Sequence, residues 1–503
     1  MSTGPGEAAL LLRSVSPGNA DAVFTAGARA VKAGLAADAL PLLEQALERH
    51  PSDARIWQVL GLANRQLEEL APAMAAFAKA AALAPRDALI AHSLARATME
   101  AGLPAIELFE RAHALAPNDG SVLLGRAAAQ LAEGRIDAAI AGLDEQVRHN
   151  PGWLPGHATI CRLRWLAGER ESFTASFEAA VAAAPREVAI WREWADTLTH
   201  AGHYDATLAV VAAGRAAAGG HFMFDAVEAL ALSEKGEIAA ADARFAALGP
   251  ITHVTMAARY VRHLLRAGRP DEASKFAEPW LRAPEADLLW PYVASAWRLT
   301  GDSRWQWLEG DERLVGVYDL GDAIPSLDAL AEVLRGLHLD LHQPLEQSVR
   351  GGTQTDGPLF SRIEPEIRAL RAAIVAAVER HIAQLPPPEP GHPSLIAKRA
   401  PVRFSGSWSV RLTGAGFHSN HIHPAGWLSS AFYVALPAMG GGHEGWLKLG
   451  EPQAELGLDL EPFRYIEPKV GRLALFPSTM WHGTMPFAAG ERMTVAFDVA
   501  RPA

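Results

Sequence analysis

The stretch Ile56-Trp-Gln-Val-Leu-Gly61, followed by Ala73-Met-Ala-Ala-Phe-Ala78, shows the pattern that decides the fold of the first three fifths of the chain. The first segment carries a small residue in a helical pattern, and a short polar turn separates it from the second. Small residues allow paired helices to approach closely. The stretch therefore predicts one pair of packed helices.

The same pattern returns along the chain at a fixed interval. From about residue 20 to about residue 300 the sequence is rich in Ala and Leu, and the pattern fades only near Gly219-Gly220. A proline, which cannot continue a helix, recurs at spacings close to 34 residues, at Pro51, Pro85, Pro117, Pro151 and Pro185. A period of this length is typical of two helices per unit, so we expect a helical solenoid.

This region resembles the tetratricopeptide repeat family. The resemblance covers more than half of the chain, although individual units are loose and several aromatic positions are replaced. It implies a superhelix whose concave face binds a peptide or protein partner. The period by itself indicates only a solenoid, which could also serve as a structural spacer or form a homodimer.

Composition excludes several classes of protein. The chain has 503 residues, 49% hydrophobic content and a net charge of -11, which favour a globular protein of two or three domains without a basic nucleic-acid face. It has neither a basic leader nor an apolar run of membrane-spanning length, so we expect neither secretion nor membrane insertion. The single cysteine, Cys161, excludes an internal disulfide and makes the cytoplasm the expected location.

The repeat is lost between Trp305 and about Pro401. Residues 326–341 are predicted to form a helix, and a later apolar stripe from Ile367 to Ile382 predicts a second one. Between them lies the polar run 347–355, which contains two adjacent glycines. It is either a surface loop or a substrate loop that presents donors from Arg350, Thr353 and Gln354.

From Val402 onward the sequence changes to short strands separated by turn residues. Apolar and polar residues alternate in Trp408–Leu412, and β-rich runs follow at 427–436, 473–476 and 494–499. This pattern predicts a jelly-roll barrel. The predicted fold is therefore multidomain α + β, a helical solenoid followed by a double-stranded β-helix with supporting helices.

Two histidines near the start of this region are candidate metal ligands. In an extended segment His421 and His423 project from the same side, although a chain with 19 histidines contains about one such pair by chance. The downstream context strengthens the hypothesis, because His482 follows a buried strand. A non-haem Fe(II) oxygenase needs three ligands on one face of the metal. Arg492 and Thr494, on one face of the last strand, could bind the far carboxylate of a 2-oxo acid.

The ordered set of motifs in this region resembles a known domain. The motifs are Trp408-Ser-Val-Arg411, His421-Ile-His-Pro424, Gly426–Val434, Phe476-Pro-Ser, Trp481-His482 and Arg492. Together with Arg350–Thr355 they resemble the 2-oxoglutarate/Fe(II) dioxygenase domain found attached to tetratricopeptide repeats. The resemblance implies Fe(II), 2-oxoglutarate and O2, with hydroxylation as the usual outcome. It also implies cosubstrate binding by Arg492, Thr494, Tyr433 and Arg411.

The sequence departs from the wider superfamily at His423, which stands where a carboxylate is expected. Either three imidazoles hold the iron, or His423 is not a ligand, or a carboxylate such as Glu444 or Asp498 completes the site. We favour His421, His423 and His482 as ligands and catalytic residues. His418 either orients a ligand or ends a strand.

These interpretations lead to one leading function and two alternatives. The leading hypothesis is a 2-oxoglutarate/Fe(II)-dependent dioxygenase that hydroxylates a peptide or protein presented by the repeats. The alternatives are a scaffold with an inactive barrel and a three-histidine dioxygenase that uses no 2-oxoglutarate. The expected segments are an N-terminal segment at 1–20, the solenoid at 21–304, a helical connector with the polar loop at 305–400, and the oxygenase core at 401–503.

Overall fold

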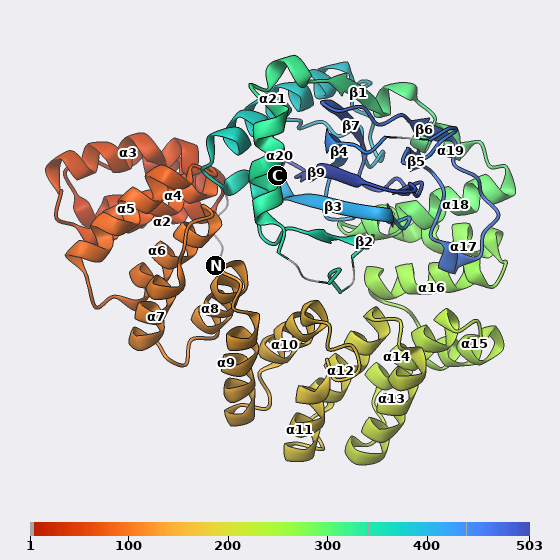
Figure 1. The fold of residues 1–503 in the computed structure, drawn as a ribbon. Coiled ribbons are helices and arrows are strands. Elements are labelled where there is room, and N and C mark those ends of the chain that lie inside the picture. Colours follow the sequence, from red (N-terminus) through yellow and green to blue (C-terminus); the bar gives the residue numbers. More distant parts are fainter. Residues whose placement is uncertain (1–4, 340–341, 346, 439, 503) are drawn as a thin grey trace. The chain divides into compact units, whose positions relative to one another are not determined.

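The computed structural model describes residues 5–339, 342–345, 347–438 and 440–502. Helices account for the regular structure as far as Glu309, and strands with a few helices follow (Figure 1). The chain divides into two compact units, Met1–Leu143 with Gly357–Arg368 and Asp144–Asp356 with Ala369–Ala503. The predicted organisation, a helical solenoid followed by an antiparallel β domain, is confirmed.

The first unit is built from helices that pack consecutively in antiparallel pairs. They are α1 (Pro5–Ser14), α2 (Ala20–Lys32), α3 (Ala36–Arg49), α4 (Ala54–Gln66), α5 (Leu70–Leu83), α6 (Ala88–Glu100), α7 (Ile106–Leu115), α8 (Gly120–Ala132) and the first part of α9 (Ile136–His149). Aspartates at the position before α4, α6 and α8 cap these helices, as where Asp87 accepts from the Ile90 N–H at 3.0 Å. The recurring Pro-x-Asp therefore ends one pair and starts the next.

Close helix contact in this unit explains the small residues of the repeat. A Cβ on Gly61 would lie 2.6 Å from the ring of Phe77, and a Cβ on Gly125 would lie 2.3 Å from the ring of Phe109. Both phenylalanines are fully buried. Glycine is thus required where the aromatic ring of the second helix rests on the backbone of the first.

A later segment packs against the first unit. The Arg362 guanidinium donates to the Gly102 carbonyl at 3.3 Å, and Arg368 forms an ion pair with Glu69 at 2.9 Å. The backbone N–H of Ile363 also donates to the carbonyl of Ala101. Residues 357–368 therefore belong to the solenoid unit in space, although they follow it by more than 200 residues in sequence.

The helices of the second unit continue the same pairwise pattern. They are α10 (Leu154–Ala167), α11 (Ala175–Ala183), α12 (Val188–His200), α13 (Tyr204–Ala218), α14 (Phe222–Glu234), α15 (Ile238–Ala247), α16 (Val254–Arg266), α17 (Pro270–Ala277), α18 (Trp290–Thr300) and α19 (Arg304–Glu309). No helix in the described part of the chain is both long and apolar enough to span a membrane.

Two antiparallel sheets form the β domain of the second unit. The six-stranded sheet has the order β1-β7-β4-β9-β3-β2, and the three-stranded sheet has the order β6-β5-β8. The strands are β1 (Gly316–Asp319), β2 (Val349–Gln354), β3 (Phe404–His418), β4 (Leu428–Ala435), β5 (Leu447–Leu449), β6 (Arg464–Ile466), β7 (Arg472–Pro477), β8 (His482–Thr484) and β9 (Glu491–Val499). Apolar residues of both sheets, including Leu449 and Phe476, share one buried cluster.

Two features of the connector differ from the sequence-based expectation. The run expected as a polar loop forms strand β2, whose residues pair with β3 at the edge of the large sheet. The helix expected at 326–341 is α20 (Leu327–Leu337), while residues 340 and 341 lie outside the described residues. The second predicted helix is α21 (Pro365–Gln384), whose apolar stripe Ile367, Leu370, Ile374 and Val378 is fully buried.

A buried carboxyl in α19 makes stability depend on pH. Glu309 accepts a hydrogen bond from the Trp305 indole at 2.9 Å, and burial raises its pKa to about 7 despite the nearby Arg298. The folded pKa lies above that of an unfolded glutamate, so the folded state binds the proton more tightly. This group therefore favours folding at low pH, and that contribution is lost as pH rises towards 7.

We predict that Glu309→Gln flattens the pH profile of stability. In the parent protein the free energy of unfolding of the second unit should fall by about 3 kcal/mol between pH 4.5 and pH 7.5 through this group. The glutamine keeps an acceptor for the Trp305 indole but cannot ionise. Denaturant unfolding at several pH values measures the effect, and an unchanged pH slope in the variant would contradict the assignment.

Candidate metal and anion site

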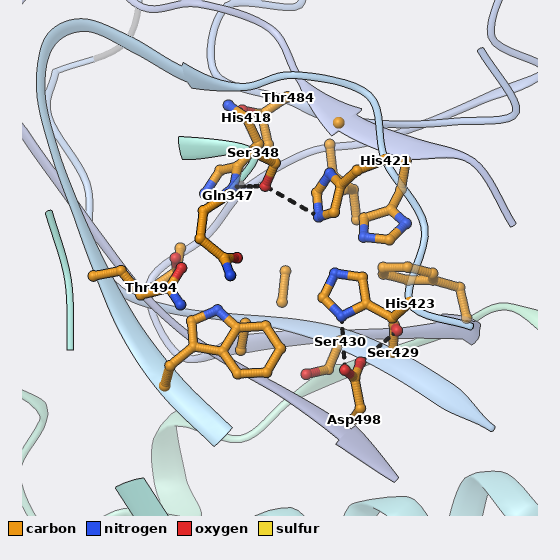
Figure 2. A pocket seen from close by; sticks show the side chains of 18 of the residues that line it. Gln347, Ser348, His418, His421, His423, Ser429, Ser430, Thr484, Thr494 and Asp498 are labelled. Carbon is orange, nitrogen blue, oxygen red and sulfur yellow. Dashed lines mark hydrogen bonds and ion pairs between the residues drawn. The ribbon is translucent and has the colours of Figure 1, made fainter. Parts of the chain in front are cut away.

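A pocket lies between the two sheets of the β domain. Its lining comes from β2, β3, β4, β7 and β9 of the large sheet, β5 and β8 of the small sheet, and the segments that precede β2 and follow β3. Figure 2 shows His421 and His423 on one side of the pocket and Thr494 on another. The pocket therefore collects side chains from both sheets.

Strand alternation decides which residues of β9 reach this pocket. Arg492, Thr494, Ala496 and Asp498 line it, whereas the residues between them point to the other face of the sheet. Trp408 reaches the pocket in the same way from β3. The two-residue period of the strands thus places a cation, a hydroxyl and a carboxylate on one wall.

The predicted histidine triad is assembled in this pocket. His421, His423 and His482 each offer a nitrogen, and these nitrogens all lie within 4.8 Å of one another. Their ring centroids are separated by 4.2 to 5.1 Å. Such a cluster has the spacing needed to hold one metal ion.

Backbone hydrogen bonds fix the positions of the three histidines. The N–H of His421 donates to the His482 carbonyl at 2.9 Å, and the N–H of His482 donates to the His421 carbonyl at 3.1 Å. His423 is held by its own N–H, which donates to the carbonyl of Ser478 at 2.9 Å. Two residues that exchange both backbone bonds lie directly opposite each other, so these two rings point into the same space.

The side-chain partners determine which ring nitrogen is free. Nδ1 of His421 lies 2.8 Å from the Ser419 carbonyl, and Nδ1 of His482 lies 3.0 Å from the Met480 carbonyl. A carbonyl can only accept, so both Nδ1 atoms carry the proton. His423 Nδ1 lies 2.6 Å from the Asp498 carboxylate, which imposes the same tautomer. Each histidine is therefore left with an Nε2 lone pair for a metal.

Asp498 orients His423. One oxygen of its carboxylate accepts from His423 Nδ1, and the other accepts from the Ser429 hydroxyl at 2.6 Å. Glu444, the other carboxylate considered from the sequence, accepts from the backbone N–H groups of Gly440 and Ala488 in an exposed loop. The geometry places Asp498 behind an imidazole, and Glu444 does not line the pocket.

Burial keeps the imidazoles of His421, His482 and His418 neutral. It lowers the pKa of His421 and His482 well below the ordinary value, and the neighbouring imidazoles lower both further. Burial also lowers the pKa of His418 to about 3, with the charge of Arg492 adding to the effect. Metal binding requires the neutral ring, so His421 and His482 can offer a nitrogen to a cation near pH 7.

Among the described residues, Arg492 is a buried cation without an anionic partner. Its side chain is 2% exposed, and Nε and Nη1 have no hydrogen-bond partner among the described residues. Its guanidinium carbon lies 5.3 Å from the centroid of the Tyr433 ring, whose hydroxyl is likewise unpaired within the described chain. Burial lowers the pKa of Arg492 from its ordinary value. An unpaired buried charge is costly, so this arrangement favours the binding of an anion.

Other residues predicted for the site lie in different places. Gln354 lines the pocket, whereas the Thr353 hydroxyl is bonded to His338 Nδ1 at 2.8 Å and Arg350 donates to backbone carbonyls. Arg411 is bound to Glu491 at 2.7 Å and does not line the pocket. It points to the opposite face of β3 because its neighbours Val410 and Leu412 face inward.

His418 and Ser348 form a polar group beside the triad (Figure 2). The Ser348 hydroxyl lies 3.2 Å from both His418 Nδ1 and His421 Nε2. A metal on His421 Nε2 would replace the second of these hydrogen bonds. Sequence reasoning missed Ser348, because a lone serine in a polar run carries no signal before β2 is paired with β3.

The aromatic residues near the pocket separate into two groups. Trp408 stacks on His423 with ring centroids 5.4 Å apart and an interplanar angle of 11°. Trp427, Phe432 and Trp481 are buried but do not line the pocket. Trp408 therefore shields the triad directly, while the others belong to the core around it.

Comparison with known proteins agrees with this geometry. Residues 406–498 match the family model described as "Putative 2OG-Fe(II) oxygenase". Residues 105–159 match a tetratricopeptide repeat model. A comparison with curated proteins gives no match. The oxygenase match contains the three histidines, Arg492 and Asp498, while β2 lies outside it.

Solved structures similar to this chain include a tetratricopeptide repeat protein. One is YrrB, a TPR protein with an unusual peptide-binding site, at 18% identity and a TM-score of 0.29 over 34% of this chain and 90% of that chain. MamA is similar at 18% identity and a TM-score of 0.29 over 35% and 92%. The pilus biogenesis factor PilW gives 17% identity and a TM-score of 0.30 over 39% and 92%.

We predict that Asp498→Asn weakens divalent metal binding about 10- to 100-fold, as found when the acceptor behind a ligating histidine is removed. The amide accepts the His423 proton less strongly and no longer favours one tautomer. Glu444→Gln is the matched control, because it changes a carboxylate of the same domain outside the pocket. Isothermal titration with the metal measures both, and equal affinities in the two variants would contradict the role of Asp498.

Proposed function

We propose that this chain is an Fe(II)- and 2-oxoglutarate-dependent dioxygenase. The observation that carries the proposal is the buried, unpaired Arg492 in the same pocket as three convergent imidazoles. A cation needs an anionic partner there, and the histidines need a metal. A metal-chelating dicarboxylate satisfies both groups at once.

The donor set fits a non-haem iron centre. His421, His423 and His482 would hold the metal through Nε2, with no carboxylate among the ligands. Three neutral ligands leave the full positive charge on the ion, which favours an anionic cosubstrate. Among the described residues that line the pocket, Asp498 is the one carboxylate, and it is engaged with His423 and Ser429.

The anion end of the pocket fits the far carboxylate of 2-oxoglutarate. Arg492 would bind it through its guanidinium and Thr494 would add a hydroxyl donor from the same strand face. The buried ring of Tyr433 faces the guanidinium, whose carbon lies 5.3 Å from the ring centroid. Arg411 has no place in this site, because it is paired on the other face of the sheet.

Iron with 2-oxoglutarate and O2 supplies oxidative decarboxylation coupled to hydroxylation of a C–H bond. The chain's own residues supply positioning. Asp498 and two backbone carbonyls hold the imidazole tautomers, and Trp408 covers His423 against solvent. The low pKa values of His421 and His482 keep their lone pairs available without competition from protons.

We propose a peptide or protein substrate for this reaction, presented by the helical array. The tetratricopeptide match and the continuous helix pairs support a role in protein recognition. The buried single cysteine and an iron centre that must stay reduced both suit the cytoplasm.

A second candidate is a three-histidine dioxygenase that acts on a small thiol acid without 2-oxoglutarate. The observation that favours it is the position of Asp498 behind His423, which leaves the metal without a carboxylate ligand. Arg492 would then bind the carboxylate of the substrate itself. Addition of 2-oxoglutarate to the anaerobic Fe(II) protein separates the two, because only the first candidate gives the metal-to-ligand charge-transfer absorption.

We predict opposite effects of Arg492→Met on stability and on binding. Replacing an unpaired buried cation by an apolar side chain of similar length should raise the unfolding midpoint of the metal-free protein. The same change should weaken 2-oxoglutarate binding to the Fe(II) protein about 10- to 100-fold, since hydrogen bonds to a charged group are lost. Differential scanning fluorimetry and the charge-transfer titration measure the two effects.

Arg411→Ala is the control for this prediction. Its guanidinium lies on the other sheet face, and Glu491 keeps a second partner in Arg335 at 2.7 Å. The control should bind 2-oxoglutarate as the parent protein does. Unchanged binding in Arg492→Met, or a loss in Arg411→Ala alone, would contradict the proposed cosubstrate site.

A further inference from the structure

The last helices before the β domain contact both metal-binding segments. Ile422, which separates His421 from His423, and Trp481, which precedes His482, pack in one apolar cluster with Trp290 and Val293 of α18. The cluster also includes residues of α16 and α17. The backbone that carries the histidines therefore rests on the end of the helical array.

Trp481 is the strongest of these contacts. Its indole N–H donates to the Pro291 carbonyl at 3.0 Å and lies 3.1 Å from the Ser295 hydroxyl. Its ring meets Tyr292 edge-to-face, with centroids 5.7 Å apart. The side chain is 2% exposed, so the indole is buried where it packs against the first turns of α18.

The backbone beside Trp481 is held from the same helix. Its carbonyl accepts from the Gly450 N–H at 2.7 Å, and the carbonyl of Gly450 accepts from Arg298 of α18. Arg298 also donates to the carbonyl of Glu461 at 2.6 Å. Helix α18 thus fixes the residue next to His482 through both its side chain and its main chain.

We propose that Trp481 is a positioning residue through which α18 sets the place of His482 and, across the backbone bridge, of His421. The inference rests on the proposed metal centre. It assigns to the end of the helical array the role of holding two of the metal-binding histidines in place. Because coupling between two sites is reciprocal, an array held in this way controls metal affinity and is itself stabilised when metal binds.

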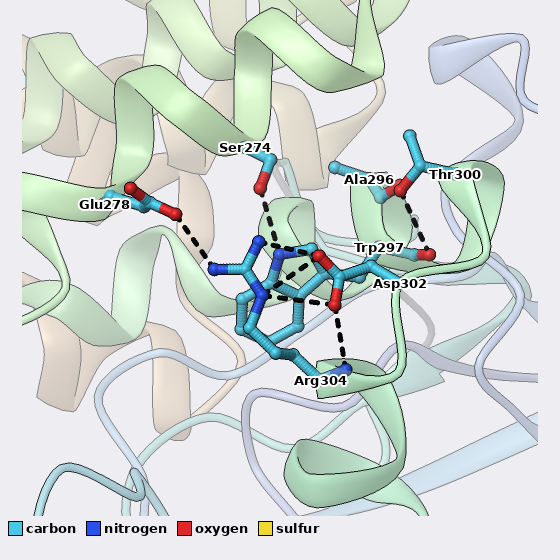
Figure 3. A network of polar contacts seen from close by, with 7 residues as sticks. All are labelled: Ser274, Glu278, Ala296, Trp297, Thr300, Asp302 and Arg304. Carbon is cyan, nitrogen blue, oxygen red and sulfur yellow. Dashed lines mark hydrogen bonds and ion pairs between the residues drawn. The ribbon is translucent and has the colours of Figure 1, made fainter.

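Helix α18 supplies a matched control on another of its faces. Trp297 of the same helix donates from its indole to the Ser274 hydroxyl of α17 at 2.9 Å, beside the ion pairs of Arg304 with Asp302 and Glu278 (Figure 3). The Trp481–Ser295 and Trp297–Ser274 contacts are both buried hydrogen bonds between an indole and a serine hydroxyl. One reaches the residue before His482, and the other stays within the helical array.

The test compares Ser295→Ala with Ser274→Ala in the full chain. Metal-free protein is titrated with Co(II), and the intensity of the d–d absorption reports affinity and ligand geometry. Loss of the hydrogen bond from the Trp481 indole to the Ser295 hydroxyl should weaken Co(II) binding about fivefold in Ser295→Ala. Trp481→Phe, which loses the indole donor and with it both hydrogen bonds but keeps a ring, should weaken it about tenfold or more and alter the spectrum. Ser274→Ala and Trp297→Phe should bind Co(II) as the parent does, whatever their unfolding midpoints.

Equal losses of Co(II) affinity in the Ser295 and Ser274 variants would overturn the inference, because the effect would then be one of general stability. A parent protein that binds no Co(II) would instead contradict the proposed function. In that case amide hydrogen exchange of residues 478–484 in the metal-free variants decides the inference. Faster exchange in Ser295→Ala than in Ser274→Ala supports positioning by α18, and equal exchange refutes it.

Discussion

The reciprocal backbone bridge between His421 and His482 is the contact on which the site depends. It joins the segment after β3 to the small sheet and sets two imidazoles side by side. The position of His423 is fixed separately, because its backbone N–H donates to the Ser478 carbonyl and its ring nitrogen Nδ1 is hydrogen-bonded to Asp498. Without this bridge the nitrogen of His482 would have no reason to converge on those of His421 and His423, since His482 comes from a separate segment of the chain. The site is therefore organised in the main chain before any metal binds.

The charge of Arg492 explains why the pocket favours an anionic ligand. The Arg492 guanidinium places a positive charge in the pocket, and a bound metal would add to it. The protein tolerates the cost of burying Arg492 because the surrounding sheets are tightly packed, as the fully buried β9 and β4 residues show. The unpaired, buried guanidinium of Arg492 lowers the stability of the fold. A residue with a purely structural role at this place would be apolar, so the arginine indicates a binding site.

Sequence reasoning predicted what depends on local periodicity. The proline interval predicted the solenoid, and strand alternation predicted which face of β9 would carry Arg492 and Thr494. It could not predict long-range pairing: β2 was expected as a loop because its partner β3 begins 50 residues later, at Phe404. Arg411 was attributed to the cosubstrate by motif position, yet its neighbour Glu491 holds it on the opposite face. Asp498 was considered as a ligand, and only the distance to His423 shows it behind the ring.

The most direct measurement is an anaerobic crystal structure of the full chain with Fe(II) and 2-oxoglutarate. The account predicts metal on Nε2 of His421, His423 and His482, the cosubstrate carboxylate on Arg492, and Asp498 still bonded to His423 Nδ1. A metal bound by the carboxylate of Asp498 in place of His423, or an Arg492 that remains unpaired with 2-oxoglutarate present, would contradict it.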